Sequence, residues 1–152
     1  MPAETRAFFL RRQESATPMW QLDARLEGDT VAIGDLPLCR ALLNDDANYP
    51  WLVLVPRLPD AHELIDLDVR QRHALTDEID RAARALRDGF RPFKLNVAAL
   101  GNLVPQLHVH VIARYEQDPA WPSPVWGRVA ARPYTPEQLV ERISVLRDAL
   151  AA

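Results

Sequence analysis

The sequence feature that most constrains the fold is the alternation of polar and apolar residues over Gln106–Ile112. Such alternation is typical of a β-strand, because successive side chains of a strand point to opposite faces of the sheet. Gln106, His108 and His110 then share one face, while the leucine and valines between them lie on the other, where a core can cover them. The sequence therefore predicts a strand that carries two imidazoles and a carboxamide on one face.

A short loop, residues 101–105, precedes this strand and contains Gly101 and Asn102. Backbone N–H groups in such a loop can bind an anion, most simply a phosphate. A neutral imidazole can attack phosphorus when a carbonyl fixes the proton on its other nitrogen and donors bind the phosphate oxygens. We therefore expect His108 to be able to attack a phosphate bound by Gly101 and Asn102, with His110 beside it.

Apolar patterns predict five further strands. Trp51–Val55 is a continuous apolar run between two prolines, which is typical of a central strand buried on both faces. The others are expected at residues 20–26, 30–34, 36–43 and 93–98. A turn at residues 27–29 would join the first two of these into a hairpin.

Two main helices are expected from the spacing of apolar residues and from their caps. The first begins after Asp66 or Asp68 and runs to about Asp88. The second spans about residues 135–150, with a threonine N-cap followed by proline and, three residues on, glutamine. A short helix is also expected over Thr5–Glu14.

The order of these elements is four strands, a helix, two strands and a helix, which predicts an α+β fold built on an antiparallel sheet. A chain of 152 residues fits one domain with one core, so we expect a single domain over residues 1–152. Cys39 is the only cysteine, which leaves no disulfide framework and favours a reducing compartment, the cytoplasm. We expect Cys39 to be a small buried hydrophobe.

Composition argues against several classes of partner. The net charge is −3, from 18 basic and 21 acidic residues, so there is no overall attraction to a nucleic-acid polymer. Apolar runs of about five residues are far shorter than a membrane span. The first residues lack a long apolar stretch, so no signal peptide is expected. Composition thus favours a small molecule as partner over a nucleic-acid polymer or a membrane.

Several residues have a second interpretation. The His-x-His spacing of His108 and His110 also suits a metal ion, with a third ligand that could come from His62, His73 or Glu116. His62 and His73 fit surface positions equally well, since they lie in a polar loop and on a charged helix.

Other side chains that could belong to the site also fit purely structural roles. Asn44 could be a turn former, and Asn96 could satisfy backbone groups in the sheet. Trp126 could reach the site, although Trp121 and Trp126 also suit packing or dimer contacts.

The stretch Gly101–Ile112 resembles the signature of the histidine triad (HIT) superfamily, which is His-φ-His-φ-His-φ-φ, with φ apolar, after a short glycine-containing loop. Gln106 stands where the first histidine of the signature would be, and His108 and His110 match the second and third. The resemblance extends upstream through Trp51–Arg57 and Asn96.

This resemblance implies roles for these residues. His108 would attack the α-phosphate of a nucleotide and form a nucleotidyl-histidine, with His110 supporting the phosphate and the leaving group. Gln106 could still form hydrogen bonds on the same face. Asn44 resembles the family position that binds ribose hydroxyls, and Asn96 a position near the phosphates.

The resemblance also implies a HIT-like α+β fold with a mostly antiparallel sheet of five or six strands and two main helices. It implies a homodimer with the central helix and an edge strand at the interface. The expected partner is a purine nucleotide or nucleotide conjugate, and no cofactor or metal is expected.

The expected function is hydrolysis of nucleoside phosphoramidates or dinucleoside polyphosphates, or nucleotidyl transfer, with a leaving-group preference altered by Gln106. One alternative is a nucleotide-binding module with little turnover, which would bind without releasing product. The other is a metal protein that uses His108 and His110, whose activity a chelator would abolish.

Overall fold

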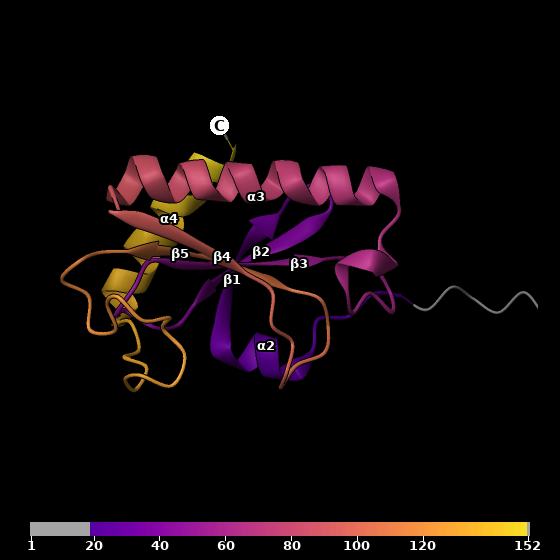
Figure 1. The fold of residues 1–152 in the computed structure, drawn as a ribbon. Coiled ribbons are helices and arrows are strands. Elements are labelled where there is room, and N and C mark those ends of the chain that lie inside the picture. The colour runs from indigo at the N-terminus through magenta and orange to yellow at the C-terminus, as the bar shows by residue number, and fades with distance from the viewer. Residues whose placement is uncertain (1–18, 152) are drawn as a thin grey trace, which may run out of the picture.

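The structure, a computed structural model, describes residues 19–151, so the helix expected over Thr5–Glu14 lies outside the described residues. Within residues 19–151, five strands form one antiparallel sheet in the order β1-β2-β3-β5-β4 (Figure 1). The strands are β1 (Thr30–Asp35), β2 (Cys39–Asn44), β3 (Trp51–Pro56), β4 (Lys94–Ala98) and β5 (Val109–Arg114). The predicted α+β class is confirmed.

The central strand β3 is buried along its whole length, which confirms the prediction from its continuous apolar run. Its side chains alternate between two separate apolar clusters. Leu52 and Leu54 belong to a large core between the sheet and the two main helices. Trp51, Val53 and Val55 belong to a second cluster on the opposite face.

Helices α3 (Val69–Phe90) and α4 (Pro136–Ala151) cover one face of the sheet (Figure 1). Asp68 caps α3 in a reciprocal pair with Gln71, which confirms one of the two predicted caps. The predicted capping at Thr135 is confirmed too, because its hydroxyl accepts from the backbone N–H of Gln138. A 3₁₀ helix, Leu64–Asp66, precedes α3. None of the helices in the described residues is long and apolar enough to cross a membrane.

Helix α3 continues slightly beyond its predicted end near Asp88. Gly89 lies inside the helix, and the left-handed conformation that ends it falls on Arg91, with φ 46°. The ring of Phe90 packs against the large core, and the Phe90 carbonyl accepts a hydrogen bond from the Tyr115 hydroxyl. Tertiary contacts of Phe90 thus carry the helix past the glycine.

The strand predicted at residues 20–26 is wrong, and so is its hairpin with residues 30–34. Helix α2 (Ala24–Asp29) occupies this region, and Asp23 caps it by accepting from the backbone N–H of Arg25 at 2.9 Å. Strand β1 pairs with β2 instead. A six-residue helix is too short to show helical periodicity, so the alternation of apolar residues that runs into its first turn misleads. The other predicted strands are found, with shifted ends.

The face of the sheet opposite α3 carries α2 and the long loop that follows β5 (Figure 1). Arg114, at the end of β5, fastens this loop through a buried ion pair with Asp118 at 2.8 Å and a hydrogen bond to the Ser123 carbonyl at 2.8 Å. The candidate site lies on this face. On the helix-covered face Cys39 is fully buried, as predicted.

Candidate active site

Two histidines form the centre of the candidate site. His108 immediately precedes β5 and His110 lies within it, and both are 7% exposed. Their ring centroids are 4.9 Å apart. Leu107 and Val109 belong to the large core on the other face, so the predicted alternation of faces is confirmed, although the strand begins at Val109 rather than at Gln106.

The proton on the His108 ring is fixed by a backbone carbonyl. Nδ1 of His108 lies 2.7 Å from the carbonyl oxygen of Gln106. Because a carbonyl oxygen can only accept, Nδ1 carries the proton and Nε2 keeps its lone pair. No hydrogen bond occupies Nε2 within residues 19–151, so this nitrogen is free to act as a nucleophile or a base.

The opposite tautomer is fixed on His110. The indole Nε1 of Trp51 donates a hydrogen bond to Nδ1 of His110 at 3.0 Å. An indole N–H can only donate, so Nδ1 must accept and the ring proton is on Nε2. Trp51 reaches His110 because β3 and β5 pair with Val53 opposite His110, which makes Trp51 a diagonal neighbour on the same face.

Burial keeps the His110 ring uncharged. Burial first, and the charge that His108 can carry second, lower the pKa of His110 from 6.5 to about 4. The hydrogen bond from Trp51 also opposes protonation of Nδ1, because it occupies the lone pair that a proton would need. At neutral pH His110 therefore presents an N–H that can donate a hydrogen bond but cannot readily release its proton.

The carboxamide of Gln106 is bound to a segment in the N-terminal part of the chain. Its Oε1 accepts from the backbone N–H of Asp23 at 2.8 Å, and its Nε2 donates to the carbonyl of Gln21 at 2.9 Å. Gln106 thus contributes its backbone carbonyl to the site, while its side chain is engaged elsewhere.

A cavity of about 430 Å³ opens beside the two histidines. Four residues predicted to bind or react with a nucleotide line it together: Asn44, Gly101, Asn102 and His108. Gly101 has φ 77°, a left-handed conformation that glycine adopts without strain and that turns the loop toward His108. His110 also lines this cavity, whereas Gln106 and Asn96 do not.

Asn96 lies on β4, and its side chain is bound to a buried arginine. Its Oδ1 accepts from Nη1 of Arg114 at 2.8 Å. Asn96 thereby helps to orient the guanidinium that holds the loop after β5. The structure thus places Asn96 behind the site rather than in its cavity.

Apolar residues form the wall of the cavity, and among them Trp126 was expected from the sequence to reach the site. They come from α2, β3, the loop before β5 and the loop after it, and include Leu26, Val53, Val104 and Trp126. Trp126 packs edge-on against His110, with ring centroids 5.1 Å apart. For Trp126 the signal was its place among prolines after the histidine strand. Leu26 had none, because α2 was predicted as a strand.

The metal alternative requires a third ligand near the two imidazoles. Within residues 19–151, no group of three or more histidine, cysteine, aspartate or glutamate side chains could hold a metal ion. Nδ1 of His62 lies 3.2 Å from the carbonyl of Pro105, His73 is exposed on α3, and Glu116 is exposed after β5.

The chain is similar to known proteins in both sequence and structure. The family model for the HIT domain matches residues 25–117. A histidine triad protein from Bradyrhizobium japonicum is 54% identical, with a TM-score of 0.86 over 88% of this chain and 99% of that chain. One from Marinobacter aquaeolei VT8 is 43% identical, with a TM-score of 0.86 over 88% and 98%. One from Sinorhizobium meliloti 1021 is 42% identical, with a TM-score of 0.83 over 86% and 96%. No curated protein matches the chain.

Proposed function

The chain belongs to the HIT domain family, whose members generally bind nucleotides and act on them, and on this premise we propose that it cleaves or transfers the nucleotidyl group of a nucleotide conjugate through His108. The observation that carries this proposal is the 2.7 Å contact between Nδ1 of His108 and the Gln106 carbonyl. This contact leaves the lone pair of Nε2 free at a cavity of nucleotide size.

The reaction is a double displacement at the α-phosphorus. The lone pair of His108 Nε2 forms a bond to phosphorus as the bond from phosphorus to the leaving group breaks, and the leaving group departs with the electron pair. The positive charge that develops on the ring is stabilised by the Gln106 carbonyl through Nδ1–H. Water then attacks phosphorus and loses a proton to the bulk solvent, and the breaking N–P bond returns its electrons to Nε2.

His110 stabilises the phosphate or the leaving group by donating a hydrogen bond from Nε2–H. Trp51 occupies Nδ1, and burial lowers the pKa of His110 to about 4. This histidine therefore donates a hydrogen bond from Nε2–H without transferring the proton. The leaving group must then depart without a proton from His110. A phosphate anhydride fits this requirement better than an amine, so a dinucleoside polyphosphate is the favoured substrate class over a phosphoramidate.

The cavity residues suggest how the nucleotide is held. The base, expected to be a purine, packs against the apolar wall formed by Leu26, Val53 and Val104, and Asn44 binds the ribose hydroxyls. Asn102 and the backbone that follows Gly101 bind the phosphate. The side chain of Asn96 supports this arrangement through Arg114 rather than by direct contact.

We also propose that two copies of the chain associate through β4 and the central helix α3. β4 is an edge strand; Phe93, just before it, is 64% exposed and Val97, within it, is 51% exposed. An exposed edge with apolar side chains favours pairing with another chain. Light scattering of the full chain tests this, and a monomer at micromolar concentration would contradict it.

The test of the proposed reaction is release of AMP from a diadenosine polyphosphate and from an adenosine phosphoramidate, with and without a chelator. Wild type should release AMP in both conditions, and His108→Ala should lose at least about 10³-fold in rate. His73→Ala, which removes an exposed imidazole from α3, is the matched control and should keep wild-type rates.

Two results would contradict the proposal. If wild type binds AMP but releases no product from either substrate, the binding-module alternative is favoured. Release that a chelator abolishes would favour the metal alternative.

A further inference from the structure

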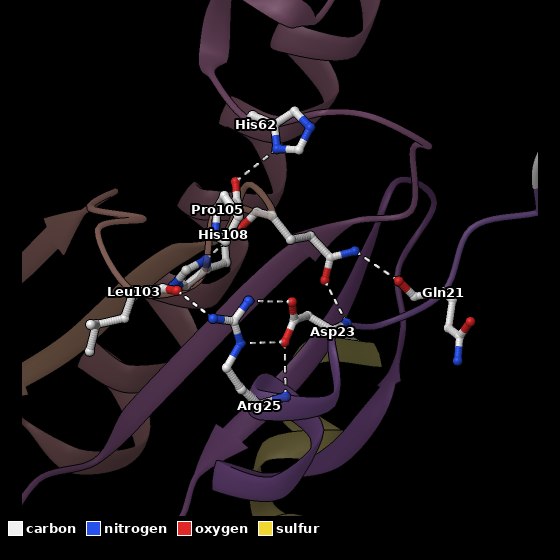
Figure 2. A network of polar contacts seen from close by, with 8 residues as sticks. Gln21, Asp23, Arg25, His62, Leu103, Pro105 and His108 are labelled. Carbon is white, nitrogen blue, oxygen red and sulfur yellow. Dashed lines mark hydrogen bonds and ion pairs between the residues drawn. The ribbon is translucent and has the colours of Figure 1, made fainter.

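Both polar atoms of the Gln106 carboxamide are bound by one segment in the N-terminal part of the chain. Oε1 accepts from the backbone N–H of Asp23 at 2.8 Å, and Nε2 donates to the carbonyl of Gln21 at 2.9 Å (Figure 2). A carboxamide carries its donor and its acceptor in one plane at the end of the side chain, so it can pair with a carbonyl and an N–H two residues apart. Each polar atom is therefore engaged before any substrate binds.

The bound segment, residues 21–25, is called the strap below. Its second attachment is Arg25, whose Nη1 donates to the carbonyl of Leu103 at 2.7 Å (Figure 2). The same guanidinium binds the Asp23 carboxylate at 3.0 and 3.1 Å. Hydrogen bonds from the Arg25 side chain keep the pKa of Asp23 below its ordinary value, so the pair stays charged. The strap is thus fastened to the loop before β5 at two places.

The peptide group that follows Gln106 is held at both ends. Its carbonyl, from Gln106, lies 2.7 Å from Nδ1 of His108, and its N–H, from Leu107, donates to the Ala61 carbonyl at 2.9 Å. The preceding carbonyl, from Pro105, lies 3.2 Å from Nδ1 of His62. The side chain of Gln106 is the fourth fixed point of this short stretch, and within residues 19–151 it is the one that joins the stretch to the strap.

We propose that Gln106 is a positioning residue that fastens the strap to the loop, and thereby keeps its own carbonyl on Nδ1 of His108 and Nε2 turned to the cavity. This inference rests on the proposed reaction through His108. It assigns Gln106 no contact with the substrate. Glutamine at this position then has a positioning role of its own and does not only mark the absence of a histidine.

The geometry of the two side chains explains why a histidine would not replace Gln106. A neutral imidazole also has one donor and one acceptor, but its two nitrogens point in divergent directions, one near the base of the ring and the other at its far edge. It cannot present a donor and an acceptor together to Gln21 and Asp23. A histidine would therefore release at least one of the two backbone groups.

The experiment compares Gln106→Met, which has similar length and no hydrogen bonds, with Gln106→Glu, which keeps the acceptor for Asp23 and loses the donor to Gln21. Gln106→His tests the triad directly. Gln21→Ala is the matched control, because Gln21 contributes only its backbone and its side chain points away from Gln106 (Figure 2). The readouts are ¹⁵N NMR of the His108 ring, hydrogen exchange of the Asp23 amide, and kcat and KM for AMP release.

In Gln106→Met the Asp23 amide should exchange about tenfold faster and kcat should fall about tenfold with KM little changed. The His108 ring should change from the single Nδ1–H tautomer to a mixture. Gln106→Glu should keep slow exchange at Asp23, Gln106→His should release AMP no faster than wild type, and Gln21→Ala should match wild type.

A wild-type tautomer and wild-type exchange in Gln106→Met would overturn the inference, as would a Gln106→His variant faster than wild type. If wild type releases no AMP, the proposed reaction fails. The NMR and exchange measurements on the ligand-free protein then still decide whether Gln106 positions His108.

Discussion

Removal of the indole N–H of Trp51 should change both the protonation of His110 and the unfolding free energy of the protein. Trp51 is 7% exposed, and its Nε1 donates to Nδ1 of His110 at 3.0 Å. In Trp51→Phe this buried nitrogen loses its donor, which costs about 1–3 kcal/mol of unfolding free energy at pH 7. Because the lost hydrogen bond favoured the neutral ring, the pKa of His110 should rise by about one pH unit.

The pH dependence of stability gives this prediction a distinctive form. In wild type the pKa of His110 is about 4 when folded, and its ordinary value is 6.5, so the unfolded chain binds more protons between these two values. The stability from the neutral ring is complete above pH 6.5 and is lost as the pH falls through 4. This loss amounts to about 3 kcal/mol in wild type and about 2 kcal/mol in Trp51→Phe. The two stability curves should therefore converge at low pH.

The assay is urea unfolding of wild type and Trp51→Phe at several pH values between 4 and 7.5. Trp126→Phe is the control, since Trp126 packs against the same ring at 5.1 Å without a hydrogen bond to it. By ¹⁵N NMR, His110 should keep its Nε2–H tautomer in the control and become mixed in Trp51→Phe. A difference between wild type and Trp51→Phe that stays constant from pH 7.5 to 4 would refute the reasoning.

Three further variants test other parts of the account. Arg114 and Asp118 are 1% and 3% exposed, so Arg114→Met should lower the unfolding free energy by about 3–5 kcal/mol in urea titrations, and a loss below 1 kcal/mol would contradict this. Gly101→Ala forces alanine to φ 77°, which should cost about 1–2 kcal/mol in the same titrations and raise KM; unchanged stability would mean that the loop adopts another conformation. Asn44→Ala should raise KM for a nucleotide substrate about tenfold with a smaller change in kcat, and an unchanged KM would remove Asn44 from the ribose site.

Most of the strands and the face that carries the two histidines could be predicted from the sequence because both depend on local periodicity. The face of His108 and His110 follows from alternation alone, and it holds even though β5 begins at Val109. The caps at Asp68 and Thr135 are equally local, since each pairs with a residue three positions ahead.

The partners of the site residues could not be predicted, because they come from distant parts of the chain. Gln106 binds Asp23 and Gln21, which are 83 and 85 positions away. Trp51 reaches His110 through the register of β3 against β5, which the sequence does not specify. The occupied carboxamide of Gln106 and the fixed tautomer of His110 therefore emerged only with the structure, and both revise the chemistry that the triad pattern suggests.

The proposed mechanism requires a covalent intermediate at Nε2 of His108. The most direct measurement is the stereochemistry of hydrolysis at an α-phosphorothioate of single configuration, with the reaction run in ¹⁸O-labelled water. Two successive in-line displacements, first by His108 and then by water, predict overall retention of configuration at phosphorus. Inversion would mean that water attacks directly, and it would contradict the role of His108 as nucleophile.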